Sequence, residues 1–265
     1  MVEAFISFSE SLWRGWLSGT LDVPQLPQFV KDTFRLDAAP EPYICFDAGP
    51  RPLVALLTNP GYVMDHQHRA NVQPGGYPLS TTLDYSSAAR ALGSYYKERL
   101  KGAAGRRIDA LLELSRLVDL QGVLQVEVCP FHSRSLSRTK KDALLRTIDE
   151  GGLLGCYTEH LTAFLQPRPV VILSAVSTST PVGMESVTRS SWLTRVAKIA
   201  GLVLEDAKLV RLVAKNSATT AAALVSLEDG IPKALVLMMG GNYLPAEKGL
   251  RVLAEALQIT PAQVG

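Results

Sequence analysis

A polar side chain with catalytic potential stands where an apolar run of the sequence stops. Residues 53–58 form a short apolar run that is typical of a buried parallel strand, and Asn59-Pro60-Gly61 follows it at once. Because this tripeptide cannot continue a strand, the backbone is expected to turn there. Ligands of open α/β sheets bind at the carboxyl ends of strands, where the amide oxygen of Asn59 can hold a water molecule. The alternative is an ordinary strand-end turn.

Acid–base groups follow in the segment 62–82, which has no regular period and contains two consecutive glycines. Loops of this length inside a domain are usually functional. Asp65 is a candidate general base, with a cap or turn residue as the alternative. His66 and His68 are candidates to donate hydrogen bonds to a phosphate or to a leaving group. A metal site is not expected, because no third ligand with zinc-type spacing lies near these histidines.

A second apolar run, residues 123–128, brings Glu127 and Cys129 to the end of another expected strand, which Pro130 breaks. Ionised, Glu127 is only a hydrogen-bond acceptor, whereas in a dry pocket its protonated form also donates. The alternative places Glu127 on the exposed face of an edge strand. Cys129 is expected to be a small core residue, and nothing specific supports a thiolate nucleophile.

This pair of strand ends resembles the uracil-DNA glycosylase superfamily, with the single-strand-selective and mismatch-specific glycosylases as the nearest branches. Members carry a strand followed by Asn-Pro-Gly, then an aromatic residue that stacks on the flipped base, then a strand ending in Asn-x-Cys-Pro. The resemblance covers about residues 40–140. It implies that Asn59 is catalytic and that Tyr62 and Tyr77 contact the base, although Tyr77 stands a few residues later than the family's stacking aromatic.

Two departures from the family concern the base that the pocket accepts. Where this chain has Gly61, the uracil-specific family has a Tyr that closes the pocket beside the 5-position of the base. Gly61 also permits a positive φ in the turn. Where the family has an Asn that reads the edge of uracil, this chain has Glu127, which in its ionised form suits the amino group of cytosine and repels O4 of uracil. Together these residues imply a cytosine with a bulky 5-substituent.

The carboxyl-terminal part departs further, because the family inserts a His-Pro-Ser loop into the duplex and this chain has no His there. Asn242 is the candidate catalytic group at the corresponding strand end, and Tyr243 is a candidate wedge in the base stack. A basic segment just after Cys-Pro-Phe supplies candidates for phosphate contacts, namely Arg134, Arg138, Lys140 and Lys141. The alternative for this basic segment is a solvated helix face.

The elements that must position these residues alternate between strands and helices. Strands are expected at 43–46, 53–58, 123–128, 169–175, 208–214, 221–227 and 234–239, and helices at 3–18, 86–101, 106–118, 136–150, 153–165, 191–200 and 246–257. This alternation predicts an α/β protein, a three-layer α/β/α fold with a mainly parallel central sheet that is uracil-DNA glycosylase-like. One domain is expected over residues 1–265, with residues 1–40 as a helical N-terminal extension.

Composition limits the compartment and the partners. Three cysteines make neither a disulfide framework nor a metal site by spacing, so the four-cysteine iron–sulfur branch of the superfamily is excluded and a reducing cytoplasm is expected. No apolar run is long enough to span a membrane, and the start lacks the basic region of a signal peptide. A net charge of +2 does not by itself demand a nucleic-acid partner. No cofactor is expected, and the protein is expected to be a monomer.

The residues and the resemblance together predict a DNA glycosylase that flips and excises a modified pyrimidine base by water attack at C1′, leaving an abasic site. The favoured substrate is glucosylated 5-hydroxymethylcytosine of phage DNA, because the superfamily includes bacterial antiphage glycosylases. Antiviral defence is then the expected role. One alternative is a repair glycosylase for uracil or another damaged base, and another is a non-catalytic binder of modified or single-stranded DNA.

Overall fold

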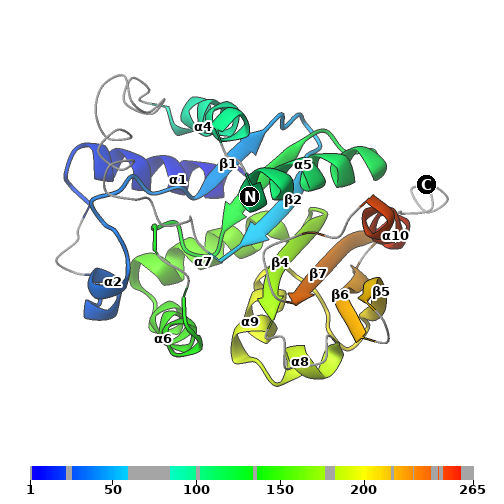
Figure 1. Cartoon of the computed structure of the whole chain (residues 1–265). Helices are drawn as coiled ribbons and strands as arrows, with labels where there is room; N and C mark the ends of the chain where they lie inside the picture. Colours follow the sequence, from blue (N-terminus) through cyan, green and yellow to red (C-terminus); the bar gives the residue numbers. More distant parts are fainter. Residues whose placement is uncertain are drawn as a thin grey trace. The chain divides into compact units, whose positions relative to one another are not determined.

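Seven strands among the described residues form one sheet, in the order β1-β3-β2-β4-β7-β6-β5 (Figure 1). The structure is a computed structural model that describes residues 2–21, 26–58, 84–99, 102–133, 136–176, 183–215, 218–228, 230–239, 244 and 247–257. The strands are β1 (Tyr43–Phe46), β2 (Leu53–Leu57), β3 (Val123–Glu127), β4 (Val170–Val176), β5 (Lys208–Lys215), β6 (Ala218–Glu228) and β7 (Ile231–Met239). The helices among these residues are α1 (Val2–Leu17), α2 (Gln28–Thr33), α4 (Tyr85–Arg99), α5 (Gly102–Leu117), α6 (Arg138–Asp149), α7 (Gly152–Leu165), α8 (Met184–Thr188), α9 (Ser191–Ile199) and α10 (Glu247–Leu257).

The centre of the sheet is parallel and one edge is antiparallel. β4 pairs in parallel with β2 on one side and with β7 on the other. β2 and β3 also run in the same direction, because Leu53 N donates to Gly122 O where they start and Val128 N donates to Leu57 O where they end. β6 pairs antiparallel with both β7 and β5. The predicted α/β class with a parallel centre is therefore confirmed, whereas the antiparallel edge was not predicted.

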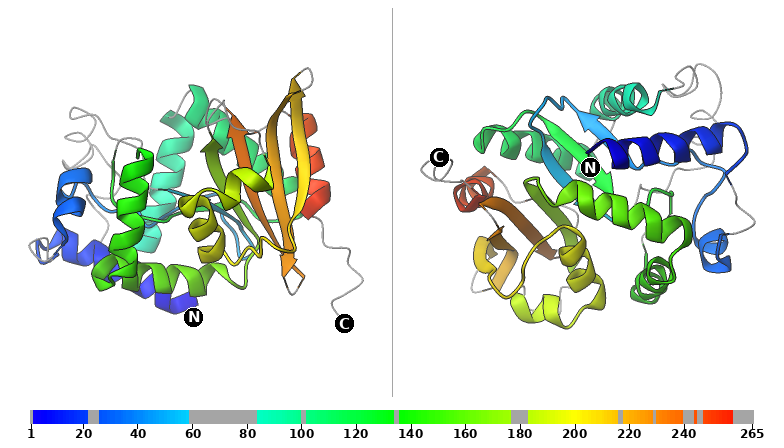
Figure 2. Two further views of the ribbon diagram at one scale, coloured as in Figure 1. Left: turned by 90° about the horizontal axis from the view of Figure 1, so that it is seen from below. Right: turned by 180° about the vertical axis from the view of Figure 1, so that it is seen from behind.

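The chain folds into two compact units, each made of three chain segments. Unit 1 comprises Met1–Cys45, Leu57–Tyr95 and Val126–Phe164, and unit 2 comprises Phe46–Leu56, Tyr96–Gln125 and Leu165–Gly265. Within unit 2, α10 lies on one side of the β7-β6-β5 strands and α8 and α9 lie on the other (Figure 2). Residues 234–238 of β7 are accordingly buried without alternation, as expected for a strand that is covered on both faces.

A glycine allows β3 to start close to the chain that leaves β1. Gly122 has a φ of +72°, and a Cβ atom at this position would collide with the backbone carbonyl of Asp47. The Gly122 carbonyl accepts hydrogen bonds from Leu53 N (3.0 Å) and from the hydroxyl of Ser115 (2.8 Å). Only glycine combines this backbone conformation with so close an approach, so Gly122 sets the register in which β3 enters the sheet beside β2.

Aromatic side chains fill the core of unit 1. Phe5 of α1 contacts Tyr43 of β1 and both Tyr157 and Phe164 of α7, with ring centroids 6.0, 5.8 and 4.7 Å apart. Trp13, two turns further along α1, is also buried and helps to make one face of this helix apolar. The aromatic cluster therefore holds α1 and α7 against β1, which stands beside β3 in the sheet.

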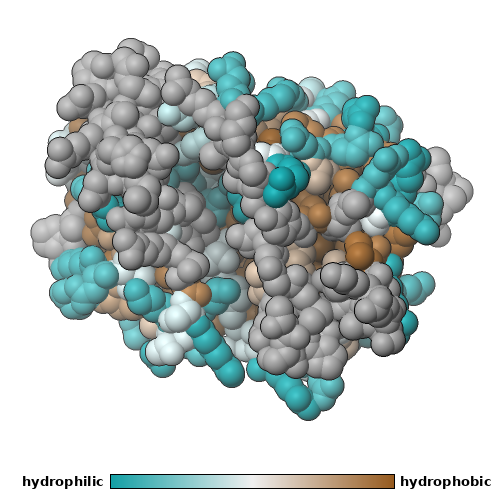
Figure 3. Space-filling model, viewed as in Figure 1, coloured by the Kyte–Doolittle hydropathy of each residue, from teal (hydrophilic) through white to brown (hydrophobic). Residues whose placement is uncertain are grey.

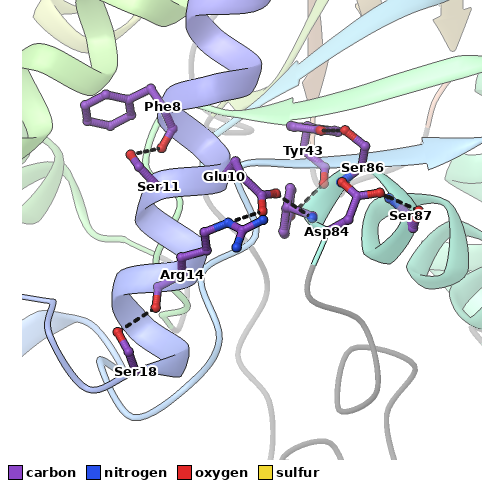
Figure 4. Close-up of polar contacts among 10 residues, drawn as sticks. Phe8, Glu10, Ser11, Arg14, Ser18, Tyr43, Asp84, Ser86 and Ser87 are labelled. Carbon is purple, nitrogen blue, oxygen red and sulfur yellow. Dashed lines mark hydrogen bonds and ion pairs between the residues drawn. The ribbon is translucent and has the colours of Figure 1, made fainter.

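Two carboxylates cap the amino end of α4 (Figure 4). Asp84 accepts hydrogen bonds from the backbone N–H groups of Ser86 and Ser87 (3.1 and 3.2 Å) and from the Ser87 hydroxyl (2.5 Å). Glu10 of α1 accepts from the backbone N–H of Tyr85 (2.6 Å). The Ser87 hydroxyl, helped by the two N–H groups, lowers the pKa of Asp84 below its usual 3.8. These contacts satisfy donors that the first helical turn otherwise leaves unpaired.

A buried lysine closes the carboxyl end of α7. Lys233 of β7 is 0% exposed, and its ammonium group donates to the carbonyls of Leu165 (2.6 Å), Gln166 (3.0 Å) and Arg168 (2.5 Å). Carbonyls at the end of a helix lack intrahelical partners, and a cation there is also favoured by the helix dipole. Lys233 thus joins residues 165–168 to the parallel part of the sheet within unit 2.

None of the described helices is both long and apolar enough to cross a membrane. On the face shown in Figure 3, hydrophilic residues lie beside smaller apolar areas.

Candidate functional site

The two strand ends that the sequence singles out lie side by side in unit 1. Val128 N donates to Leu57 O (2.8 Å), and Cys129 N donates to Thr58 O (3.0 Å). Thr58 is the residue directly before Asn59, which itself lies outside the described residues. The backbone that follows β3 is therefore hydrogen-bonded to the last residue before the Asn-Pro-Gly tripeptide. A polar group at each of these strand ends would be able to face one ligand.

Glu127 is the polar group at the end of β3, and it is 1% exposed. β3 stands between β1 and β2 in the sheet, so the alternative of an exposed face on an edge strand is wrong. The backbone N–H of Glu127 donates to Pro42 O (3.2 Å). Because ligands of open α/β sheets bind at the carboxyl ends of parallel strands, a carboxylate at this end of β3 is a candidate for recognition.

Tyr157 of α7 supports the backbone beneath this carboxylate. Its hydroxyl donates to Glu127 O (2.8 Å) and also lies 3.3 Å from Pro42 O. Burial raises the pKa of Tyr157 well above its usual 10.0, and the nearby carboxylate of Glu127 raises it further. The phenol therefore stays neutral and keeps its proton as a donor, which fixes the carbonyl of Glu127 and hence the direction in which β3 ends.

Cys129 is fully buried, as predicted for a core residue. Burial raises the pKa of its thiol to about 12, and the charge of Glu127 raises it as well, while a hydrogen bond from the backbone N–H of Phe131 offsets only part of this effect. Because the thiolate is the nucleophilic form of cysteine, this environment is unsuited to nucleophilic catalysis. Cys129 instead belongs to the buried core next to the end of β3.

A buried pair of ionisable residues, Glu41 and His132, was not predicted from the sequence. Nε2 of His132 lies 3.5 Å from Oε1 of Glu41, and both side chains are almost completely buried. The same two chain segments are joined by backbone hydrogen bonds, from Glu41 N to Pro130 O (2.8 Å) and from Arg35 N to His132 O (2.8 Å). The pair therefore helps to fix the segment that follows Glu127, although nothing in the sequence indicated that these distant residues meet.

The basic segment after Cys-Pro-Phe enters α6. Ser137 is the N-cap of this helix and accepts from Lys140 N (3.3 Å). Arg138 and Lys140 are exposed, whereas Lys141 is half-buried and burial lowers its pKa. The first turn of α6 contains no acidic residue, so these cations stand at the end of the helix where the dipole favours anions.

Most of the other predicted site residues lie outside the described residues: Asn59, Gly61, Tyr62, Asp65, His66, His68, Tyr77, Arg134, Asn242 and Tyr243. Their roles remain predictions. Of the predicted set, the structure describes Glu127, Arg138, Lys140 and Lys141, all in unit 1. Within the described ranges, no group of three or more His, Cys, Asp or Glu side chains is arranged to hold a metal ion.

Comparisons with known proteins do not assign the chain to a family. A scan against protein-family models gave no match, and searches of the curated proteins and of the solved structures gave none either. What the fold defines is a mixed α/β protein with a seven-stranded sheet, in which a buried carboxylate ends one of two adjacent parallel strands.

Proposed function

We propose that this protein is a DNA glycosylase that flips a modified pyrimidine out of DNA and excises it by attack of water at C1′. One observation carries the proposal: buried Glu127 ends β3 where Cys129 N is hydrogen-bonded to Thr58 O, directly before Asn59. In α/β sheets with parallel strands, ligands bind outside the carboxyl ends of the strands, at a topological switch point. At such a point the strands that follow one strand in the chain lie on both of its sides in the sheet. β2 is such a strand, since the next two strands in the chain, β3 and β4, flank it.

The buried carboxylate supports recognition of a cytosine-type base. An enzyme that acts on a base takes it out of the stack and reads its edge with hydrogen bonds in a closed pocket. In its ionised form Glu127 accepts from the exocyclic amino group of cytosine, and it repels the O4 atom of uracil. Gly61 would leave space beside C5, so the favoured substrate is a cytosine with a bulky substituent there, such as glucosylated 5-hydroxymethylcytosine.

The proposed chemistry needs a held water molecule and a stabilised leaving group. The amide oxygen of Asn59 orients the water, and Asp65 takes its proton as the oxygen bonds to C1′. The bond from C1′ to the base nitrogen breaks, its electron pair leaves with the base, and the base takes up a proton. Asn242 donates to the departing base and stabilises the charge that gathers on it. The products are a free base and an abasic site.

The remaining proposed residues hold the DNA and the base. Tyr62 and Tyr77 contact the flipped base, His66 and His68 donate to phosphate or to the leaving group, and Tyr243 fills the gap in the stack. The cations Arg134, Arg138, Lys140 and Lys141 supply the sequence-independent part of the affinity by neutralising phosphates.

The experiment that tests this proposal compares three DNAs of one sequence, which contain uracil, 5-hydroxymethylcytosine or its glucosylated form at one position. After incubation with the protein, hot alkali converts abasic sites to strand breaks. We expect breaks in the glucosylated DNA and none with an Asn59→Ala variant, because loss of one preorganised polar group costs about a hundredfold or more in rate. Breaks only in the uracil DNA would indicate a repair glycosylase, and retention of DNA without breaks would indicate a binder; either result overturns the proposal.

A further inference from the structure

A hollow of about 320 Å³ lies in unit 1 between α2 and the start of α6. Three cationic side chains line it, Lys31 and Arg35 from one side and Lys140 from the other, and Asp32 is the carboxylate among its lining residues. The buried hydroxyl residue Ser133 closes it toward the segment that follows β3. Three cations from two separate elements therefore face a space large enough for a phosphate group and its neighbouring sugar.

Cationic residues outnumber acidic ones in the lining of this hollow, three to one. The first turn of α6 carries Arg138, Lys140 and Lys141 and no acidic residue, although cations are unfavourable at the amino end of a helix. Lys31 and Arg35 line the opposite side of the hollow, where Arg35 is ion-paired with Asp37. An anion bound in the hollow would interact favourably with Lys140 and with the helix dipole.

The arginine of the hollow is held in a defined orientation. Its guanidinium makes two hydrogen bonds to Asp37, from Nε to Oδ1 (2.9 Å) and from Nη2 to Oδ2 (2.8 Å). The backbone of Arg35 is joined to His132 by the bridge that fixes the segment after β3. Asp37 thus takes up one edge of the guanidinium and fixes its plane at the wall of the hollow.

The hollow is also connected to the candidate base-reading residue. Residues 127–133 are buried throughout, and this segment runs from Glu127 to Ser133 at the wall of the hollow. Hydrogen bonds from Glu41 N to Pro130 O and from Arg35 N to His132 O hold the segment along its length. A ligand in the hollow would therefore stand at a fixed position relative to Glu127.

We propose that this hollow is a phosphate subsite that binds a backbone phosphodiester of the DNA strand whose base is flipped. The identity of the ligand rests on the proposed function. Bound there, the phosphodiester sets the register of the strand, so that one nucleotide at a defined distance along it reaches Glu127. Phosphate contacts of this kind position a protein on DNA without reading sequence. Lys31 and Arg35 are then DNA-contacting residues in addition to the basic segment of α6.

The test measures binding of a labelled, unmodified oligonucleotide without terminal phosphates to a Lys31→Gln/Lys140→Gln double variant, over a range of salt concentrations. We expect affinity to fall about tenfold or more, and the slope of log K against log salt to become shallower by about one, as for the loss of one neutralised phosphate. A Lys198→Gln/Lys248→Gln variant is the matched control, because both lysines are exposed on helices of unit 2. A Lys31→Arg/Lys140→Arg variant should keep the affinity of the parent, which separates loss of charge from loss of folding.

Competition at constant ionic strength identifies the form of phosphate that the hollow prefers. We expect a short unphosphorylated oligonucleotide to displace the labelled one, and inorganic phosphate or a 5′-phosphorylated nucleotide not to displace it at comparable concentration. Displacement by either small phosphate would overturn the assignment to a backbone diester, and an unchanged salt slope in the Gln double variant would overturn the subsite itself.

Failure of this inference is distinguishable from failure of the proposed function, because the binding assay requires no base release. If the double variant loses affinity but the parent releases no base, the glycosylase proposal fails and the subsite stands. If the parent releases bases and the double variant binds DNA as the parent does, the subsite fails and the glycosylase proposal stands.

Discussion

Replacement of Glu127 by Gln is the change that most directly probes base selection. The two side chains have nearly the same shape, but Gln is neutral and carries an amide donor in place of one carboxylate oxygen. If Glu127 accepts a hydrogen bond from the amino group of cytosine, the variant loses a charge-assisted contact to cytosine and also loses its repulsion of uracil. We therefore expect Glu127→Gln to shift preference from cytosine-type toward uracil-type bases, and Glu127→Asn to shift it in the same direction.

The magnitude follows from the burial of the carboxylate. Glu127 is 1% exposed, so water cannot replace a contact that the substitution removes. One good contact to a base is worth about 1–3 kcal/mol of discrimination, and each 1.4 kcal/mol is about tenfold in rate. The ratio of the two rates of base release should accordingly move by about five- to a hundredfold. A Glu159→Gln variant makes the same change of charge on an exposed position of α7 and should leave the ratio unchanged.

The assay measures single-turnover release of both bases from one sequence context by the parent and each variant. Urea unfolding of the same preparations shows whether the buried substitution keeps the fold. A folded Glu127→Gln protein with the parent's ratio of rates would make Glu127 a structural residue, and the assignment of a cytosine-type base would lose its main support.

Three further predictions test the structure itself. Lys233→Met should lower the free energy of unfolding by about 1–3 kcal/mol. This is the cost of the buried Leu165 carbonyl losing its donor, because water can reach the carbonyls of the other two acceptors. An effect no larger than that of Lys248→Met, on the exposed face of α10, would refute this prediction. When native protein is treated with iodoacetamide at pH 8, mass spectrometry should find exposed Cys156 modified and Cys129 unmodified, because burial raises the pKa of the Cys129 thiol to about 12. Rapid modification of Cys129 would contradict its burial. Asp84→Asn should destabilise the protein near pH 7, because the hydrogen bonds that lower the pKa of Asp84 stabilise the fold only while its carboxylate is ionised. The difference in urea midpoint between the variant and the parent should therefore shrink as the pH falls below 3.8. A difference that does not depend on pH would contradict this prediction.

The central strands could be predicted closely because their burial on both faces leaves a continuous apolar run in the sequence. The strand expected at 53–58 is β2 (Leu53–Leu57), and the one expected at 123–128 is β3 (Val123–Glu127). The proline that breaks the second run also indicated that Glu127 would stand near a strand end. The burial of Glu127, in contrast, depends on β1 and β2 standing on either side of β3, which no local pattern specifies.

The antiparallel edge of the sheet shows where local patterns mislead. Pro232 lies between the strands expected at 221–227 and 234–239, yet it belongs to β7, opposite Leu227 of β6. Proline is tolerated near the start of a strand, so its presence marks a boundary only approximately. β5 and β6 are separated by too few residues for a parallel crossover, which would have indicated antiparallel pairing.

Side-chain partners that are distant in the chain were beyond prediction. Lys233 follows a proline in an apolar strand, and the sequence was equally compatible with a lysine that faces solvent. Only the tertiary structure brings the carbonyls at the end of α7 within reach of its ammonium group. The contact between Glu41 and His132 likewise depends on tertiary structure, since neither residue belongs to a motif. Pairings of this kind are specified by packing rather than by propensity, and they include the links that hold the candidate site.

The most direct test of the central claim is chromatography with mass detection of the small molecules released from DNA that carries glucosylated 5-hydroxymethylcytosine. We predict that the intact protein liberates the free glucosylated base, in an amount equal to the abasic sites formed in the DNA, and that Asn59→Ala liberates none above background. Recovery of the DNA with every modified base still attached, under conditions in which the protein is folded and binds that DNA, would contradict the claim that this protein breaks the bond between C1′ and the base.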